Sequence, residues 1–176
     1  MTQHTFHAAA LETLRVGYGD AALGIVAVAE SAQGVVALFI GDDRTQLRRD
    51  LETAFPLAEI AHDQTGLAPT IAEAVALVDA PHRGRDLTLD LRGTALEIAI
   101  WQALRAIPAG ETRTYGAIAQ GLPTPATARD VGAACAANRI AVAVPCHRVV
   151  KADGSIAGYR WGVRRKRRLI NVEGVA

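Results

Sequence analysis

The spacing of apolar and polar residues predicts regular secondary structure early in the chain. Residues 22–31 and 34–42 are short apolar runs rich in Val and Ile, and the polar residues between them predict an antiparallel β-hairpin. Residues 42–55 predict an amphipathic helix, because apolar side chains recur there every four positions: Leu47, Leu51 and Phe55. The first half of the chain therefore mixes strands and helices.

Two further elements are expected before residue 92. A helix is predicted over residues 71–80, which follow Pro69, and residues 85–93 alternate like a strand with its apolar face formed by Leu87, Leu89 and Leu91. Together these elements predict a small α/β domain over residues 1–91. Its His and acidic residues form no catalytic constellation in the sequence, so we interpret this domain as a structural scaffold.

After Gly93 the pattern changes to short helices. Residues 94–107 predict a helix whose apolar side carries Leu96, Ile100 and Leu104, with Trp101 beside them. A short helix is expected from Tyr115 and, after a Gly-Leu-Pro turn, another over about residues 125–137. Two short helices joined by such a turn are typical of a helix-turn-helix. Residues 92–176 are thus predicted to form a mostly α-helical domain.

The last of these predicted helices has almost no large side chains. A helix that reads base edges would carry Arg, Asn or Gln, whereas this one carries Gly132, Ala133, Ala134, Ala136 and Ala137. Such a helix can approach a nucleic-acid backbone closely and bind without regard to sequence. Alternatively, the alanines pack in a tight helical core. The sequence of this stretch alone does not separate the two interpretations.

Composition places the chain among ordered globular proteins. Of its 176 residues, 50% are hydrophobic and 21% are charged, which is enough apolar material for a real core. Its apolar runs are shorter than the roughly 20 residues that span a bilayer. The polar residues 1–7 lack the basic-then-apolar pattern of an export signal. We therefore expect a cytoplasmic protein that does not associate with membranes.

The net charge of +1 hides a strong asymmetry. Residues 1–87 contain six Arg against twelve acidic residues, whereas residues 88–176 contain 13 Lys and Arg against six acidic residues. A basic second half of this kind predicts a polyanionic partner, with nucleic acid the first candidate.

Only two cysteines are present, Cys135 and Cys146, too few for a disulfide framework or a four-cysteine zinc site. Four of the five histidines show no ligand spacing: His4, His7, His62 and His82. No metal or cofactor is expected, and Cys146 should be a free thiol.

The sequence around Cys146 suggests a nucleophile. Pro145 precedes this cysteine and His147 follows it, and a neighbouring histidine is the usual agent that takes a thiol proton. An acid must then orient the histidine. Spacing cannot choose among the six acids of the basic half, which are Asp90, Glu97, Glu111, Asp130, Asp153 and Glu173. The alternative is a buried structural cysteine.

Four segments resemble a known family, the O6-alkylguanine-DNA alkyltransferases. They are the PCHRV motif at residues 145–149 within ARDVGAACAANRIAVAVPCHRVV, the stretch LRGTALEIAIWQALRAIPAGETRTYGAIA at residues 91–119, GYRWGVRRKRRLINVEG at residues 158–174 and, more weakly, parts of residues 22–43. The GYRWG form is most similar to the carboxy-terminal domains of bacterial adaptive-response proteins. The resemblance covers nearly the whole chain. It implies a ribonuclease H-like α/β domain followed by a winged-helix, helix-turn-helix domain.

The resemblance implies a role for each residue of the reactive centre. Cys146 resembles the thiolate that accepts the alkyl group by in-line displacement, and His147 the base that removes its proton through a water. Glu173 resembles the acid that orients His147. Asn138 matches the asparagine that braces the turn between the DNA-binding helix and the active-site segment.

Further residues are implied to bind DNA and the extruded base. Tyr115 matches the residue that turns the target phosphate and donates toward the purine, and Arg129 the arginine that replaces the extruded nucleotide. The DNA-binding surface would also include Thr127, Ala128, Ala136, Arg164 and Arg165. The pocket would be formed by Tyr115, the carbonyls of Cys146 and Val149, Tyr159, Arg160 and Trp161.

Two departures from the family pattern carry expectations. Trp161 stands where some relatives have glycine, so we expect a narrow pocket that prefers methyl to benzyl groups. Asp130 places an acid directly after Arg129, which should weaken phosphate attraction there.

The resemblance implies DNA repair without a cofactor. A monomer, associated with the nucleoid in the cytoplasm, would transfer methyl groups irreversibly from O6-methylguanine in duplex DNA, and from O4-methylthymine, to Cys146. The flipped nucleotide would give the thiolate access to the lesion. One alternative is a non-catalytic lesion sensor or an alkylation-responsive DNA-binding regulator. A cysteine hydrolase is a third interpretation, which the basic helical context disfavours.

Overall fold

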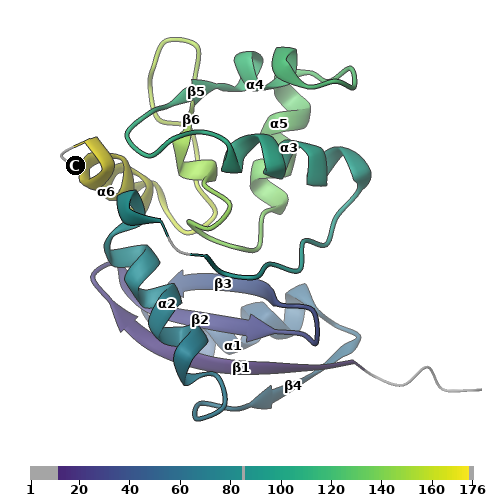
Figure 1. Cartoon of the computed structure of the whole chain (residues 1–176), viewed down its shortest axis with the longest axis vertical. Coiled ribbons are helices and arrows are strands. Elements are labelled where there is room, and N and C mark those ends of the chain that lie inside the picture. The colour runs from purple at the N-terminus through teal and green to yellow at the C-terminus, as the bar shows by residue number, and fades with distance from the viewer. Residues whose placement is uncertain (1–11, 85, 175–176) are drawn as a thin grey trace, which may run out of the picture.

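The structure, a computed structural model, describes residues 12–84 and 86–174. It has a four-stranded mixed sheet with helices on both faces, below a group of short helices (Figure 1). The expected order, a mixed α/β half followed by a mostly helical half, is confirmed at this level. The polar residues 1–7, with His4 and His7, lie outside the described residues.

The sheet has the strand order β3-β2-β1-β4. β2 (Gly24–Glu30) and β3 (Val35–Gly41) form the predicted antiparallel hairpin. β1 (Glu12–Ala21) is antiparallel to β2 and parallel to β4 (Ala58–His62). Neither β1 nor β4 was predicted from the sequence. β3 is the last strand on its side, and its residues from Val35 to Ile40 are buried.

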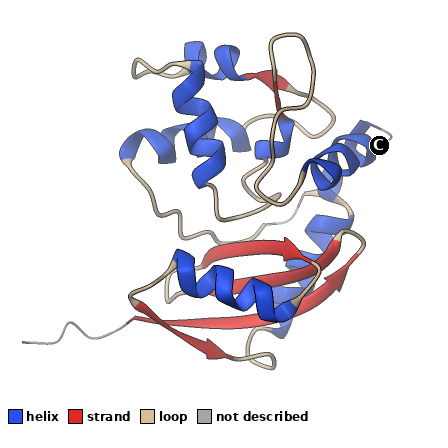
Figure 2. Cartoon of the chain, turned by 180° about the vertical axis from the view of Figure 1, so that it is seen from behind, coloured by secondary structure: helices blue, strands red, loops and turns tan. Residues whose placement is uncertain are grey.

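One helix covers each face of the sheet (Figures 1 and 2). α1 (Arg44–Ala54) buries Leu47 and Leu51 as predicted, and α2 (Ala68–Asp79) replaces the helix expected over residues 71–80. α2 lies close to β1 because Gly17 has no side chain: a Cβ there would lie 2.5 Å from Cδ1 of Ile71. Two of the predicted helices are thus confirmed, with shifted ends.

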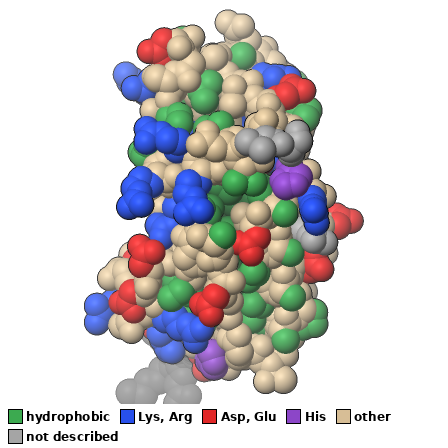
Figure 3. All heavy atoms as spheres, turned by 90° about the vertical axis from the view of Figure 1, so that its left-hand side faces the viewer, with side chains coloured by type: hydrophobic (Ala, Val, Ile, Leu, Met, Phe, Trp, Pro, Cys, Tyr) green, Lys and Arg blue, Asp and Glu red, His purple; other side chains and the backbone are tan. Residues whose placement is uncertain are grey.

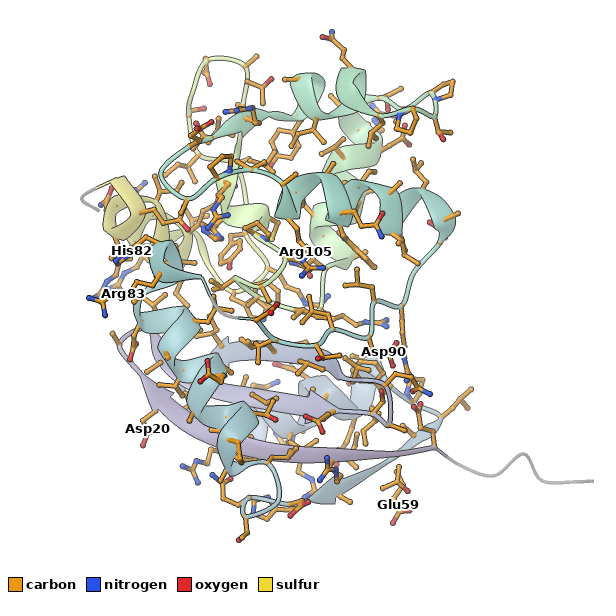
Figure 4. All side chains as sticks on the ribbon, in the orientation of Figure 1. Asp20, Glu59, His82, Arg83, Asp90 and Arg105 are labelled. Carbon is orange, nitrogen blue, oxygen red and sulfur yellow. The ribbon has the colours of Figure 1, made fainter. Side chains whose placement is uncertain are left out.

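The strand predicted over residues 85–93 is wrong. Among residues 86–93, which the structure describes, only one bridge forms: Val35 N donates to Thr88 O and Asp90 N donates to Val35 O, both at 2.9 Å. The segment leaves the sheet to reach the upper half, so its backbone does not continue to pair with β3. It is fastened by Arg92, which donates to Asp90 (labelled in Figure 4) and, through both terminal nitrogens, to Glu12.

Three helices make up much of the upper half. α3 (Ala95–Arg105) begins with a capping box of Thr94 and Glu97, and α4 (Tyr115–Gly121) begins at Tyr115 as expected. α5 (Ala128–Ala137) begins later than predicted, because Thr127 and Asp130 form its capping box.

The remaining elements surround the Cys146 segment. They are the 3₁₀ turns η1 (Pro81–Arg83) and η2 (Cys146–Arg148), the parallel pair β5 (Arg113–Thr114) and β6 (Val149–Val150), and α6 (Val163–Gly174). None of the described helices combines the length and the apolar surface that a membrane crossing requires.

The outer edge of β3 binds the segment that leads to Cys146. Leu38 N donates to Arg139 O, and Ala141 N donates to Leu38 O, both at 2.9 Å. The rings of Phe39 and Trp161 also meet across this junction, with centroids 6.2 Å apart. The first half of the chain therefore supports the reactive segment of the second half directly.

Trp101 joins α3 to α5 and should stabilise the fold measurably. Its buried indole Nε1 donates to Ala134 O, one of the last carbonyls of α5, at 2.9 Å. Trp101→Phe leaves that carbonyl without this partner, so we expect the free energy of unfolding to fall by about 1–3 kcal/mol in urea denaturation. Trp161→Phe is the matched control, because the indole of Trp161 makes no hydrogen bond to another described residue. Equal losses in the two variants would contradict this role.

Candidate active site

Cys146 begins the turn η2 and is buried. Pro145, with φ −82° and ψ 61°, forms a tight turn in which Cys146 N donates to Val144 O at 2.8 Å. Proline fixes φ near this value, so the residue before Cys146 favours the turn by itself. Arg148 N then donates to Pro145 O at 3.0 Å, which sets Cys146 and His147 on a single 3₁₀ turn.

Asn138 closes the loop that leads to Cys146. This residue ends α5 and is only 1% exposed. Its Nδ2 donates to Val144 O at 3.0 Å and to Cys146 Sγ at 3.3 Å, and its Oδ1 accepts from Ile140 N at 2.9 Å. One side chain thus fixes both ends of the loop and touches the thiol.

The same loop contains a strained residue. Val142 has a φ of +66°, a conformation that a β-branched side chain rarely adopts. Ala143 N donates to Ala141 O at 2.7 Å around it. Such strain persists only where surrounding contacts enforce it, and here Leu38 and Asn138 hold the loop from two sides.

His147 is fully buried and is oriented by Glu173, on α6. Its Nε2 lies 2.9 Å from Glu173 Oε1. A carboxylate only accepts hydrogen bonds, so Nε2 carries the hydrogen and Nδ1 carries the lone pair. Nδ1 is buried and has no hydrogen-bond partner among the described residues. Of the six acids open from the sequence, Glu173 is the one that meets His147.

Arg148 completes this cluster and was not assigned a role from the sequence. Its Nε donates to both carboxylate oxygens of Glu173 at 3.1 Å, its Nη2 to Oε1 at 2.6 Å and its Nη1 to Ile107 O at 2.7 Å. Burial opposes ionisation of Glu173, but the hydrogen bonds from His147 and Arg148 outweigh it and lower the pKa of Glu173 to about 2. Glu173 is therefore a carboxylate with a permanent counter-ion.

Cys146 and His147 are both neutral at rest. Burial raises the pKa of the Cys146 thiol, although the Asn138 amide and the charge of Lys166 oppose this. Burial also lowers the pKa of His147. Glu173 opposes this shift, whereas the charges of Arg148 and Lys166 add to it. The site thus holds a thiol next to a neutral imidazole.

A cavity of about 350 Å³ opens at Cys146. Burial and the two nearby sulfurs raise the pKa of Tyr115 to about 12, so its hydroxyl remains a donor. The hydroxyl of Tyr159 is buried without a hydrogen-bond partner among the described residues. The lining consists of Tyr115, Gly132, Cys135, Ala136, Cys146, Gly158, Tyr159 and Arg160. A planar group with acceptors fits these walls.

The placement of Trp161 in this pocket is wrong. Its side chain is buried between Phe39 and Tyr159, at centroid distances of 6.2 and 5.3 Å, and does not line the cavity at Cys146. A large ring gains more by packing at the junction of the two halves than by facing the pocket. Val149 is likewise buried in β6 and absent from the lining.

α5 turns its small residues outward. Ala133 and Ala136 are exposed, whereas Val131 and Ala134 face the core. Core packing therefore explains only part of its alanine content. Arg129 is exposed one turn before Gly132, which lines the cavity, and its guanidinium makes no hydrogen bond or ion pair with a described residue.

Two other predicted residues of α5 lie at its first turn. Thr127 and Ala128 are exposed, and Thr127 is the N-cap. The carboxylate of Asp130 accepts from Thr127 N and Oγ1, both at 2.7 Å. Asp130 thus has a capping role that the sequence interpretation did not assign.

Arg164 and Arg165 do not line the Cys146 cavity. They line a different hollow beside residues 21–24, on the α6 side of the molecule, where Figure 3 shows basic side chains across the middle. Arg165 donates to Leu23 O at 2.8 Å, to Trp161 O at 2.9 Å and to Asp42 at 2.8 Å. These bonds tie the two halves together and leave Arg165 little freedom to bind a phosphate.

No metal centre is found in the part of the chain that the structure describes. Within residues 12–84 and 86–174, no three His, Cys, Asp or Glu side chains are arranged to hold an ion.

Sequence comparison agrees with this geometry. A profile of the family described as "6-O-methylguanine DNA methyltransferase, DNA binding domain" matches residues 95–175. The inducible methylated-DNA–protein-cysteine methyltransferase of Bacillus subtilis is 34% identical over 83% of this chain and 82% of its own length. The chain belongs to the methylated-DNA–protein-cysteine methyltransferase family.

Other members of this methyltransferase family are similar along most of the chain. The Escherichia coli bifunctional transcriptional activator/DNA repair enzyme Ada is 43% identical over 92% of this chain, which spans 46% of the length of Ada. A crystal structure of the Mycobacterium tuberculosis family member OGT in complex with DNA matches with a TM-score of 0.73 and 32% identity over 93% of both chains. The mixed sheet with its helices is thus a fold of this family.

The pH dependence of stability should report the Glu173 cluster. The pKa of Glu173 is about 2 in the folded protein and 4.5 ordinarily. Its contribution is therefore complete above pH 4.5 and is lost as pH falls toward 2, by roughly 3 kcal/mol. The pKa of His147 is lowered in the folded protein. Stability therefore also falls below the ordinary pKa of histidine, where the unfolded chain binds a proton that the folded protein does not.

Arg148→Met tests the origin of this dependence. Without Arg148 the pKa of Glu173 should rise, so the loss between pH 4.5 and 2 should shrink, and stability at neutral pH should fall by about 3–5 kcal/mol. Urea denaturation at a series of pH values measures both effects. An acid dependence equal to that of the wild type would show that Arg148 does not set the charge of Glu173.

Proposed function

We propose that this chain repairs alkylated DNA by transferring the methyl group from O6 of guanine, and from O4 of thymine, to Sγ of Cys146. The observation that carries this proposal is the contiguous set of Asn138, Cys146, His147 and Glu173 at a cavity of about 350 Å³. The names of the similar proteins, methylated-DNA–protein-cysteine methyltransferase and DNA repair enzyme, support it.

The first step of the proposed reaction moves a proton. The Sγ–H bond of Cys146 breaks, and its proton passes through one water molecule to Nδ1 of His147, the nitrogen that carries the lone pair. Glu173 stabilises the imidazolium that forms, and the Asn138 amide donates to the thiolate. Because thiol and imidazole are both neutral at rest, the charges arise only within the site.

The second step forms one bond and breaks one. Sγ attacks the methyl carbon in line, the carbon–O6 bond breaks, and its electron pair stays on the purine. The hydroxyl of Tyr115, which remains protonated, donates toward the ring as this charge develops. The proton released by Cys146 finally balances the guanine, so thiol and O6-methylguanine become thioether and guanine. A thioether has no evident route back to thiol, so each molecule reacts once.

DNA binding is proposed for the outward face of α5. Its alanines allow close approach to the backbone of any sequence, and Arg129 is free to enter the base stack when the damaged nucleotide turns into the cavity. Thr127, Ala128 and Ala136 would contact DNA beside it. Arg164 remains a candidate phosphate contact, whereas the bonds of Arg165 favour a structural role.

We also propose a specific fold for each half of the chain. Residues 1–91 would form a ribonuclease H-like scaffold and residues 92–176 a winged-helix domain in which α4 and α5 are the helix-turn-helix. The mixed sheet with a helix on each face supports the first assignment, and the short connection between α4 and α5 supports the second.

Mass analysis of the Cys146 peptide tests the transfer. After incubation with a duplex that carries one O6-methylguanine, we expect one methyl group per protein, located on Cys146 and absent in Cys146→Ala. His147→Ala should slow the transfer by about 100-fold or more. A duplex that binds but leaves the peptide unmodified would instead indicate a lesion sensor.

Arg129 and Arg164 form a matched pair for DNA binding, since both are exposed. Arg129→Ala should slow repair of the duplex by at least about tenfold, because unstacking costs a few kcal/mol, while the salt dependence of binding changes little. Arg164→Ala should leave the repair rate of bound duplex intact and lower the slope of log K against log salt by about 0.9 if it contacts one phosphate. Identical effects of the two substitutions would contradict this division of roles.

A further inference from the structure

A lysine is buried among the arginines of α6. The chain has two lysines, Lys151 and Lys166. Lys151 is exposed, whereas Lys166 is only 1% exposed although it stands in the middle of the basic run 164–168. A buried ammonium group is costly unless something nearby compensates its charge. The position of Lys166 therefore requires an explanation that the exposed arginines around it do not.

No carboxylate supplies that compensation. Among the described residues, Lys166 forms no ion pair. Burial lowers the pKa of its ammonium group, and the sulfurs of Cys146 and Cys135 oppose this shift. Lys166, Leu169 and Glu173 form the buried stripe of α6, which packs against η2, the turn that begins with Cys146. Glu173 of this stripe contacts His147, and Lys166 lies two turns earlier on the same side of the helix.

We propose that Lys166 is a positioning residue whose buried ammonium group is the counter-charge for the thiolate of Cys146. This inference rests on the proposed role of Cys146 as the nucleophile. At rest the cluster of Cys146, His147, Arg148, Glu173 and Lys166 holds one uncompensated positive charge. When the proton of Cys146 moves to His147, Sγ becomes negative, and this charge compensates the positive charge of Lys166.

Arg160 is the other charged residue that lowers the pKa of Cys146, but solvent screens its charge. Arg160 is exposed, donates weakly to Ala136 O and Asn138 O at 3.3 and 3.4 Å, and lies over the ring of Phe39 at 5.3 Å. The remaining neighbours are the Asn138 amide, the thiol of Cys135 and the phenols of Tyr115 and Tyr159, which are uncharged. The only full charge buried beside the thiol, within the described residues, is that of Lys166, since Glu173 and Arg148 balance each other.

The pH dependence of Cys146 reactivity tests this proposal without DNA. The full-length protein is treated with iodoacetamide, an uncharged reagent, from mildly acidic to alkaline pH, and modification of the Cys146 peptide is followed by mass analysis. Lys166→Met removes the charge at similar length, so the pH profile should move up by about one unit and the rate at neutral pH should fall about tenfold. Lys166→Arg should restore most of both.

Stability distinguishes this role from a structural one. Removing a buried, uncompensated charge should leave the thermal midpoint of Lys166→Met unchanged or raise it, whereas loss of a structural contact would lower it. Lys151→Met, at an exposed site, should change neither quantity. An unshifted pH profile in Lys166→Met, or a rate loss equal at every pH, would overturn the proposal.

The proposed repair activity is measured separately with wild-type protein and methylated duplex. A shifted iodoacetamide profile without repair by the wild type would refute the function and leave the charge pairing standing. Repair by the wild type with an unshifted profile would refute the role of Lys166 alone.

Discussion

Leu38, in the last strand of the sheet, exchanges two backbone hydrogen bonds with residues 139–141, and the geometry of the reactive segment depends on this contact. The free edge of a sheet offers unpaired donors and acceptors that must be covered. Here the loop between α5 and η2 covers them and is itself held in return. Asn138 fixes the two ends of the loop, and Val142 keeps a positive φ within it. The first half of the chain thus helps to determine where Cys146 lies.

The electrostatics of the site follow from burial combined with fixed pairing. A buried carboxylate would ordinarily take up a proton, but Arg148 keeps Glu173 ionised, and Glu173 can then orient His147 without making it cationic. The thiol is buried away from water, and burial keeps it protonated. In the proposed reaction, charge separation would therefore be restricted to the moment when Cys146 loses its proton to His147. An arrangement of this kind would limit reaction of the thiol with other electrophiles.

Much of the fold could be predicted from local patterns, and the errors have physical causes. The hairpin of β2 and β3 and the helices α1 to α5 were predictable because their apolar periodicity matches their burial. β4 was missed because it is a half-exposed edge strand with little apolar alternation. Residues 85–93 alternate like a strand, but they connect the two halves, and their backbone pairs with β3 at one point only. Alternation of apolar and polar residues indicates that a segment has one apolar face, but it does not show that a neighbouring strand is there to pair with it.

The candidate site, too, could be predicted from the sequence only in part. The adjacency of Cys146 and His147 could be read from the sequence, but six acids were equally eligible as partner, because the convergence of α6 on η2 is a tertiary event. The same convergence assigns Lys166. Within a run of basic residues every member suggests a solvated surface, yet the positions of Leu169 and Glu173 place Lys166 on their buried stripe. A basic residue that follows the helical spacing of buried residues should therefore be assigned to the interior. Its uncompensated charge then indicates that the interior must accommodate an anion.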